Sequence, residues 1–184
     1  VVAQVLYVGA QIMCWTYIYQ YAEGIGIDSV TAGYYQMAAF VLFTVGRATG
    51  TYLLRFINAG RLLMIFSLFA IGCTIGVILI SSILGLYCLV GVSFFMSLMF
   101  PTIYGIALGG LTEDESKIGS AGLVMAIVGG ALMPKLQGML IDLGGYGVND
   151  ITILGVSEVN FSFILPALCF VYITLFGLKT SNKK

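Results

Sequence analysis

The chain has 184 residues, of which 60% are hydrophobic and only 9% are charged. Soluble domains carry about 25% charged residues, so this composition is typical of a membrane protein. Eight basic residues balance eight acidic ones, so the net charge gives no reason to expect a nucleic-acid partner. Histidine is absent and the four cysteines lie singly in apolar runs. We therefore expect no metal site, no disulfide framework and no cofactor.

Six apolar runs follow one another along the chain. A bilayer core about 30 Å thick needs roughly 20 apolar residues per helix, and runs of about this length cover 1–22, 30–54, 62–80, 84–110, 119–141 and 159–178. The sequence therefore predicts an all-α membrane protein in which residues 1–184 form one six-helix transmembrane bundle. The chain starts at Val1, already inside an apolar run, and we expect it to be part of a longer protein.

The charged residues are divided between the two ends of the predicted bundle. Lys and Arg favour the cytoplasmic side of a membrane. One end, which includes the short charged loop TEDESK, carries these basic residues: Arg55, Arg61, Lys117, Lys179, Lys183 and Lys184. The loops at the other end carry only acids: Glu23, Asp28, Asp150 and Glu158. This asymmetry predicts a multi-pass protein of a plasma or bacterial inner membrane, with both termini in the cytoplasm.

Polar residues form a stripe along the first predicted helix. Gln4, Gln11, Trp15 and Tyr19 are separated by seven, four and four positions, which places them on one helix face. An amide facing lipid would leave its hydrogen bonds unmade, so the stripe should face protein or water. Gln11 and Trp15 suit a polyhydroxylated ligand, which an amide can bond and an indole can cover. The alternative is that Gln11 bonds a neighbouring helix and Trp15 packs.

The second and fourth predicted helices contain further polar groups and a helix breaker. Arg47 is expected to reach the cytoplasmic interface as an anchor or to pair with an acid. In the fourth helix Ser93, Ser97, Pro101 and Tyr104 share one face. Pro101 removes the hydrogen bond to the Ser97 carbonyl and should kink the helix. The freed carbonyl could bind a ligand or water, or the kink could be purely structural.

Lys135 lies roughly two turns from the outer end of the fifth predicted helix. A charge at this depth is costly and is usually paired or functional. Lys135 could extend outward toward Asp142, or it could face a cavity; Gln137, about 200° further round the helix, should not share its wall. No nucleophile–base pair, metal cluster or phosphate-binding loop stands out, so the sequence does not indicate an enzyme.

Four segments carry a resemblance to a known family. FMSLMFPTIYGIALGGL (95–111) and GSAGLVMAIVGGALMPKLQGMLID (119–142) resemble two successive helices of the fucose permease family, in the major facilitator superfamily. YVGAQIMCWTY (7–17) and GRATGTYLLRF (46–56) are similar to that family as well. The order is colinear and covers nearly the whole chain. The resemblance implies that the chain is the C-terminal six-helix half of a twelve-helix transporter.

The family resemblance also implies a substrate and partners. Its members move a sugar with a proton by alternating access between two halves. The expected partners are a monosaccharide of the fucose, glucose or galactose type, a proton, the lipid bilayer and the N-terminal six-helix half, which carries the family's proton-binding carboxylates. Phe100 stands where the family has a tyrosine before Pro-Thr-Ile, which leaves the exact sugar open.

The residues expected to contact the substrate come from three predicted helices: Gln11, Trp15, Phe100, Tyr104 and Lys135. Two alternatives remain open at this point. The chain could belong to a transporter of another small polar solute, or it could be a six-helix membrane module without transport activity of its own.

Overall fold

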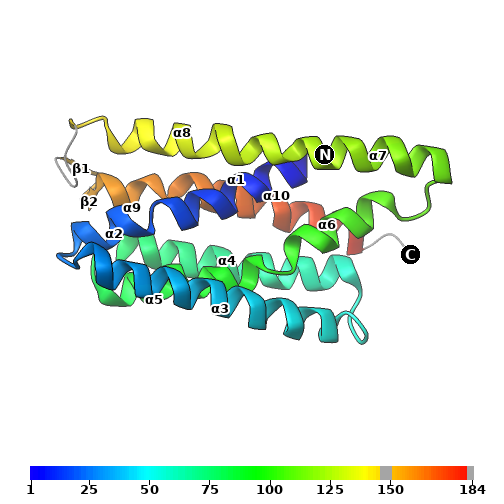
Figure 1. The fold of residues 1–184 in the computed structure, drawn as a ribbon, viewed down its shortest axis with the longest axis horizontal. Helices are drawn as coiled ribbons and strands as arrows, with labels where there is room; N and C mark the ends of the chain where they lie inside the picture. Colours follow the sequence, from blue (N-terminus) through cyan, green and yellow to red (C-terminus); the bar gives the residue numbers. More distant parts are fainter. Residues whose placement is uncertain (146–150, 182–184) are drawn as a thin grey trace.

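The structure is a computed structural model, and it describes residues 1–145 and 151–181. Its helices run side by side along one axis, with the strands at one end of the molecule (Figure 1). Several of the expected membrane helices are divided into two or three pieces. In chain order the helices are α1 Val2–Thr16, α2 Ile18–Gly24, α3 Ser29–Leu53, α4 Ala59–Leu79, α5 Ile83–Met96, α6 Met99–Leu108, α7 Glu113–Met125, a 3₁₀ turn at Ala126–Val128, α8 Gly129–Ile141, α9 Glu158–Ser162 and α10 Ile164–Ser181.

Four stretches of the described chain are long and apolar enough to cross a membrane. They are Ala59–Leu79, Ile83–Leu108, Glu113–Ile141 and Glu158–Ser181. The apolar helix Val2–Thr16 is shorter, and α2 continues it after a break at Tyr17. The 25-residue α3 includes polar positions such as Gln36 and Arg47. Each of the six apolar runs in the sequence thus contains helix.

Capping side chains account for several helix starts, among them those of α3 and α7. Asp28 accepts hydrogen bonds from the backbone N–H groups of Val30 and Thr31, both at 3.1 Å, where α3 begins. The hydrogen bond from the Thr31 hydroxyl and these backbone bonds lower the pKa of the Asp28 carboxyl. Thr112 and Glu115 form a capping box at the start of α7. The helix therefore begins at Glu113 and includes most of the expected TEDESK loop, instead of starting near residue 119.

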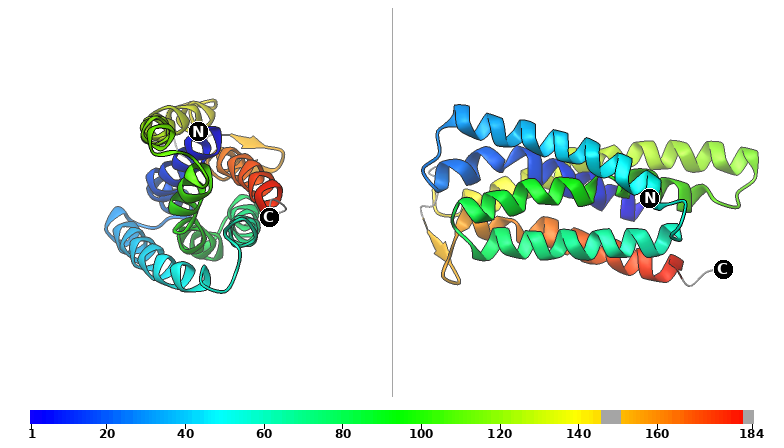
Figure 2. Two further views of the ribbon diagram at one scale, coloured as in Figure 1. Left: turned by 90° about the vertical axis from the view of Figure 1, so that its right-hand side faces the viewer. Right: turned by 90° about the horizontal axis from the view of Figure 1, so that it is seen from below.

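Glycines let the helices approach one another closely. α8 packs on α1 with Gly129 directly against the Val5 carbonyl. Likewise, a Cβ at Gly177 of α10 would lie 2.9 Å from the Met64 nitrogen of α4. Small residues allow such contacts in membrane proteins, where packing has to replace the hydrophobic driving force of water. Figure 2 shows the result end-on, with α8 and α3 on opposite sides of the bundle.

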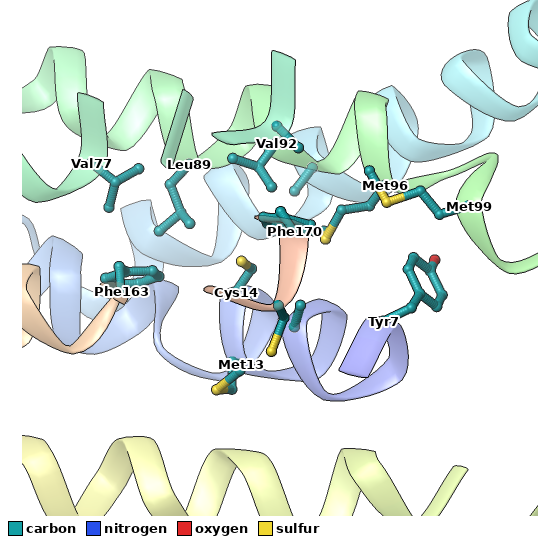
Figure 3. Close-up of a cluster of buried hydrophobic side chains, with 14 of the residues drawn as sticks. Tyr7, Met13, Cys14, Val77, Leu89, Val92, Met96, Met99, Phe163 and Phe170 are labelled. Atoms are coloured by element: carbon teal, nitrogen blue, oxygen red, sulfur yellow. The ribbon is translucent and has the colours of Figure 1, made fainter. Parts of the chain in front are cut away.

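The core lies where α1, α4, α5, α6 and α10 meet. Its side chains are almost fully enclosed. Figure 3 shows α1 contributing to this cluster from one side and α5 from the other. The labelled members of the cluster are Tyr7, Met13, Cys14, Val77, Leu89, Val92, Met96, Met99, Phe163 and Phe170.

The segment before α9 contains a small antiparallel ribbon. β1 Thr152–Ile153 pairs with β2 Val156–Ser157 through a turn at Leu154 and Gly155, both with positive φ. The segment GGYGVND (144–150), whose composition predicts a turn, lies largely outside the described residues.

Gly129→Ala should destabilise the protein. Its new methyl group would collide with the Val5 carbonyl, which is backbone and cannot rotate away. Overpacking of this kind costs roughly 1–3 kcal/mol, so the melting temperature in detergent should fall. Gly72→Ala is the matched control, because nothing lies within 4 Å of a Cβ at that helical position. Equal melting temperatures for the two variants would contradict the close α1–α8 packing.

Candidate functional site

The site is organised around a break between α5 and α6. α5 ends at Met96 and α6 begins at Met99, so the helix is interrupted one turn before Pro101. Pro101 has no N–H to donate to the Ser97 carbonyl four residues earlier. The kink predicted from Pro101 is therefore present, and it leaves a backbone acceptor inside the bundle.

Arg47 of α3 supplies the missing donors. Its Nε and Nη2 donate to the Ser97 carbonyl oxygen at 3.2 and 3.0 Å. Its guanidinium carbon also lies 4.8 Å from the ring centroid of Phe43, a favourable cation–π distance. Arg47 thus bonds to the helix break, where the sequence predicted either a cytoplasmic anchor or an ion pair.

Trp15 is held by both a hydrogen bond and aromatic packing. Its indole Nε1 donates to the Ser93 hydroxyl on α5 at 3.2 Å. The rings of Phe40 and Phe43 meet it edge-on, with centroids 4.9 and 5.1 Å away. These contacts fix the ring between α3 and α5. Since Trp15 is only partly buried, part of its surface remains open to a ligand.

Gln11 lies one turn before Trp15 on the same stripe of α1. It is partly buried, and it makes no side-chain hydrogen bond to any other residue that the structure describes. Gln4, one further step along the stripe, is completely buried, and neither of its amide atoms has a partner among the described residues. The helix-bonding alternative for Gln11 therefore has no partner here, and its amide is free for a ligand.

Phe100 and Tyr104 form an aromatic pair on α6. Their rings are stacked with centroids 6.4 Å apart and planes inclined by 12°. The edge of Tyr7, a fully buried residue of α1, meets Phe100 at 6.1 Å. Both members of the pair are partly exposed. The structure therefore links the α6 pair to the helix that carries Gln11 and Trp15.

Lys135 is separate from this group. It is an exposed residue of α8, whereas α8 faces α1 through Met133, which lies against Gly9. At 100° per residue, Lys135 projects about 200° away from Met133. Gln137 is buried and donates to the Ser162 hydroxyl at 2.9 Å, so it does not share a wall with Lys135. The ligand role of Lys135 stays a prediction without a structural neighbour in the site.

Sequence reasoning overlooked part of the aromatic surroundings. Phe40 and Phe43 had no assigned role, yet their spacing to Arg47 of seven and four positions puts all three on one face of α3. Tyr7 was also unassigned, although it lies four positions before Gln11. Helical spacing alone could have grouped these residues, but it could not show which neighbouring helix they meet.

The side chains described above come from α1, α3 and α6. They include an amide without a described partner, an indole and a stacked aromatic pair, together with a guanidinium bonded to the backbone. Within residues 1–145 and 151–181, no three His, Cys, Asp or Glu side chains gather in a way that could hold a metal ion. Aromatic faces and amides recognise the two surfaces of a sugar ring, its C–H face and its hydroxyl rim.

No protein-family model matches the sequence, but curated relatives do. The L-fucose-proton symporter of Haemophilus influenzae is 51% identical over 179 residues, which are 97% of this chain and 40% of that protein. The L-fucose-proton symporter of Escherichia coli is 33% identical over 96% of this chain and 38% of its own length. A glucose/galactose transporter of Brucella abortus is 28% identical over 94% of the chain and 39% of its own length.

A solved structure agrees with these relatives. The crystal structure of FucP, a major facilitator superfamily transporter in the outward conformation, superposes with a TM-score of 0.87 at 31% identity. The match covers 97% of this chain and 41% of FucP. The chain is a homologue of the fucose permeases. It has the fold of half of a major facilitator superfamily transporter, which confirms the predicted resemblance and fold class.

The chain spans about two-fifths of the length of the fucose permeases it matches. The named relatives are transporters rather than enzymes, in agreement with the sequence-based expectation.

Ser93→Ala should lower stability, because it leaves the Trp15 indole N–H without its acceptor. Loss of one such hydrogen bond costs about 1 kcal/mol, measurable as a lower melting temperature of the full-length protein. Ser81→Ala, an exposed position in the turn before α5, is the control and should be neutral. In a Trp15→Phe background the Ser93 substitution should have little further effect. An undiminished effect there would contradict the hydrogen bond.

Proposed function

We propose that the chain is the C-terminal half of a proton-coupled monosaccharide transporter. The main support is the 51% identity to an L-fucose-proton symporter over nearly the whole chain. The open amide and aromatic faces around the α5–α6 break add a chemical reason. This half would form one wall of a central sugar site, and an N-terminal six-helix half would form the other.

In this proposal each binding residue contacts a different surface of the sugar. Trp15 covers one face of the ring, and its orientation is set by the Ser93 bond. Gln11 exchanges hydrogen bonds with the hydroxyls, since its amide has no bond to another described residue. Phe100 and Tyr104 offer a second aromatic surface from α6. Lys135 is the remaining predicted contact, and it would approach from α8 only if the site extends to that helix.

Coupling to protons would depend on the other half. The carboxylates in the sequence lie in loops and at helix ends, and none is placed beside Trp15 or Phe100 in the described structure. Arg47 is a charged group at the break, and it is bonded to backbone. A carboxylate able to exchange a proton would therefore come from the N-terminal half.

The orientation that we propose follows from the charge distribution. Arg55 lies in the α3–α4 connection, Arg61 in the first turn of α4 and Lys117 in the first half of α7. The α3–α4 and α6–α7 connections lie at the end of the bundle opposite the β1–β2 ribbon (Figure 1). The described end of the chain lies there too, at Ser181 of α10. By the positive-inside tendency we propose that this end faces the cytoplasm, with both termini on the cytoplasmic side of a plasma or bacterial inner membrane.

A second sugar class has its own support. Glucose/galactose transporters of Brucella abortus and Helicobacter pylori are 28% and 32% identical to the chain. Phe100 has no hydroxyl to bond a substrate, unlike the tyrosine that the fucose permease pattern has at this position. L-Fucose is the first choice because of the higher identity, and D-glucose and D-galactose are the alternatives.

Uptake into proteoliposomes tests the function. The full-length protein, with the sequence upstream of Val1 read from the gene, should accumulate labelled L-fucose when the outside is made acidic, and a protonophore should abolish this accumulation. A preference for D-glucose or D-galactose would support the second sugar class. Absence of uptake for all three sugars, together with no detectable binding, would contradict the proposal.

Gln11→Ala and Trp15→Ala should each weaken sugar binding without preventing membrane insertion. Loss of one good hydrogen bond costs about 1 kcal/mol, or roughly a fivefold rise in Kd; loss of the indole should cost more, because it removes an entire stacking surface. Calorimetry on the purified full-length protein measures both. Phe56→Ala, an exposed aromatic in the turn after α3, is the matched control. Unchanged sugar affinity in both site variants would contradict the proposal that Gln11 and Trp15 contact the sugar.

A further inference from the structure

We infer that Arg47 is a positioning residue for the sugar site, because it replaces the backbone donor that Pro101 lacks. By holding the Ser97 carbonyl from α3, it sets the direction in which α6 leaves the break and so places the Phe100–Tyr104 pair. This inference rests on the proposed function for its consequence, although the contact itself stands on the geometry alone.

The need for an external donor follows from the burial of Ser97. This residue is completely enclosed, and a buried carbonyl without a partner costs the full desolvation of that group. In an uninterrupted helix the donor would be the N–H of residue 101, which proline does not have. The Ser97 carbonyl instead accepts two hydrogen bonds from one guanidinium, at 3.2 and 3.0 Å. Bonds from a charged donor are the stronger kind.

Two glycines of α3 allow this helix to approach the break closely. A Cβ at Gly46 would lie against the Phe94 carbonyl and only 2.7 Å from the Ser97 hydroxyl. One turn further, Gly50 lies against the Leu98 side chain. Only a residue without a side chain permits such proximity, so Gly46 and Gly50 bring the backbone that carries Arg47 directly onto the break.

Arg47 also connects the two aromatic parts of the site. Its guanidinium lies over the Phe43 ring, and the same ring meets Trp15 edge-on at 5.1 Å. On its other side it holds Ser97, three residues before Phe100. The positions of Trp15 on α1 and of the aromatic pair on α6 therefore both depend on one side chain of α3, that of Arg47. Loss of Arg47 should change their separation even though it touches neither Phe100 nor Tyr104 in the described contacts.

A double-mutant cycle tests whether the Arg47 guanidinium replaces the backbone N–H of residue 101 as the donor to the Ser97 carbonyl. Arg47→Ala should lower the melting temperature of the full-length protein, because it strands the Ser97 carbonyl. In a Pro101→Ala background the new N–H of residue 101 can satisfy that carbonyl, so the same Arg47 substitution should lower the melting temperature by much less. Additive losses in the two backgrounds would overturn the hydrogen-bond role. Arg55→Ala, an exposed arginine after the end of α3, controls for loss of charge and should show no coupling to Pro101.

Sugar affinity tests the positioning role. Arg47→Ala should raise the Kd for the transported sugar roughly tenfold, equivalent to one charge-assisted hydrogen bond. Arg47→Lys, which keeps a donor, should recover most of the affinity. Arg55→Ala should bind like the unmodified protein. An unchanged Kd in Arg47→Ala, at a temperature where the variant remains folded, would overturn the positioning role.

The Pro101→Ala variants separate positioning from simple stabilisation. If Arg47 acted only on stability, the Arg47→Ala/Pro101→Ala protein would regain both its melting temperature and its sugar affinity. We expect it to regain stability but not affinity, because a continuous helix points the aromatic pair in a different direction. Recovery of both would contradict positioning. If the unmodified protein binds none of the sugars, the proposed function fails, while the melting-temperature cycle still decides the Arg47–Ser97 contact.

Discussion

One backbone carbonyl, that of Ser97, imposes the central constraint on this bundle. In a lipid environment every peptide group has to be satisfied inside the protein, so a proline in a membrane helix creates a requirement for a donor elsewhere. Here the requirement is met from the neighbouring helix by Arg47. A local feature of α6 thereby becomes a tertiary contact, and the position of α3 is tied to the bend between α5 and α6.

The glycines of α3 are the second part of the same arrangement. An arginine can reach a neighbouring backbone from a greater separation, but Gly46 and Gly50 bring α3 into direct contact with Phe94 and Leu98. Phe40 and Phe43 lie on the same face of α3 and pack on Trp15. The helix therefore has two functions along one face. Its middle, at Phe40 and Phe43, forms an aromatic support, and its C-terminal part holds the break.

The apolar runs and the kink at Pro101 could be predicted from the sequence, because bilayer thickness and the missing proline N–H act locally. The start of α7 was placed too late, since the charged residues after Thr112 looked like a loop until the capping box with Glu115 was seen. Arg47 was harder still. Its partner is a backbone carbonyl fifty residues away. Pro101 marks that carbonyl as unbonded, but nothing in the sequence pairs it with Arg47. Helical spacing can show which residues share a face, but not which face of another helix they meet.

The same limit explains the separate position of Lys135. Depth in the membrane made it a reasonable ligand candidate, because a buried charge is costly wherever it points. Direction is set by packing, however, and the glycine-lined contact of α8 with α1 turns the Met133 side inward and Lys135 outward. Arg47 is the opposite case. The sequence predicted an interfacial anchor or an ion pair, and the structure places its guanidinium on the Ser97 carbonyl at the break. For cations at membrane depth, the neighbours of the backbone that carries them therefore decide which way the side chain points, which depth alone does not show.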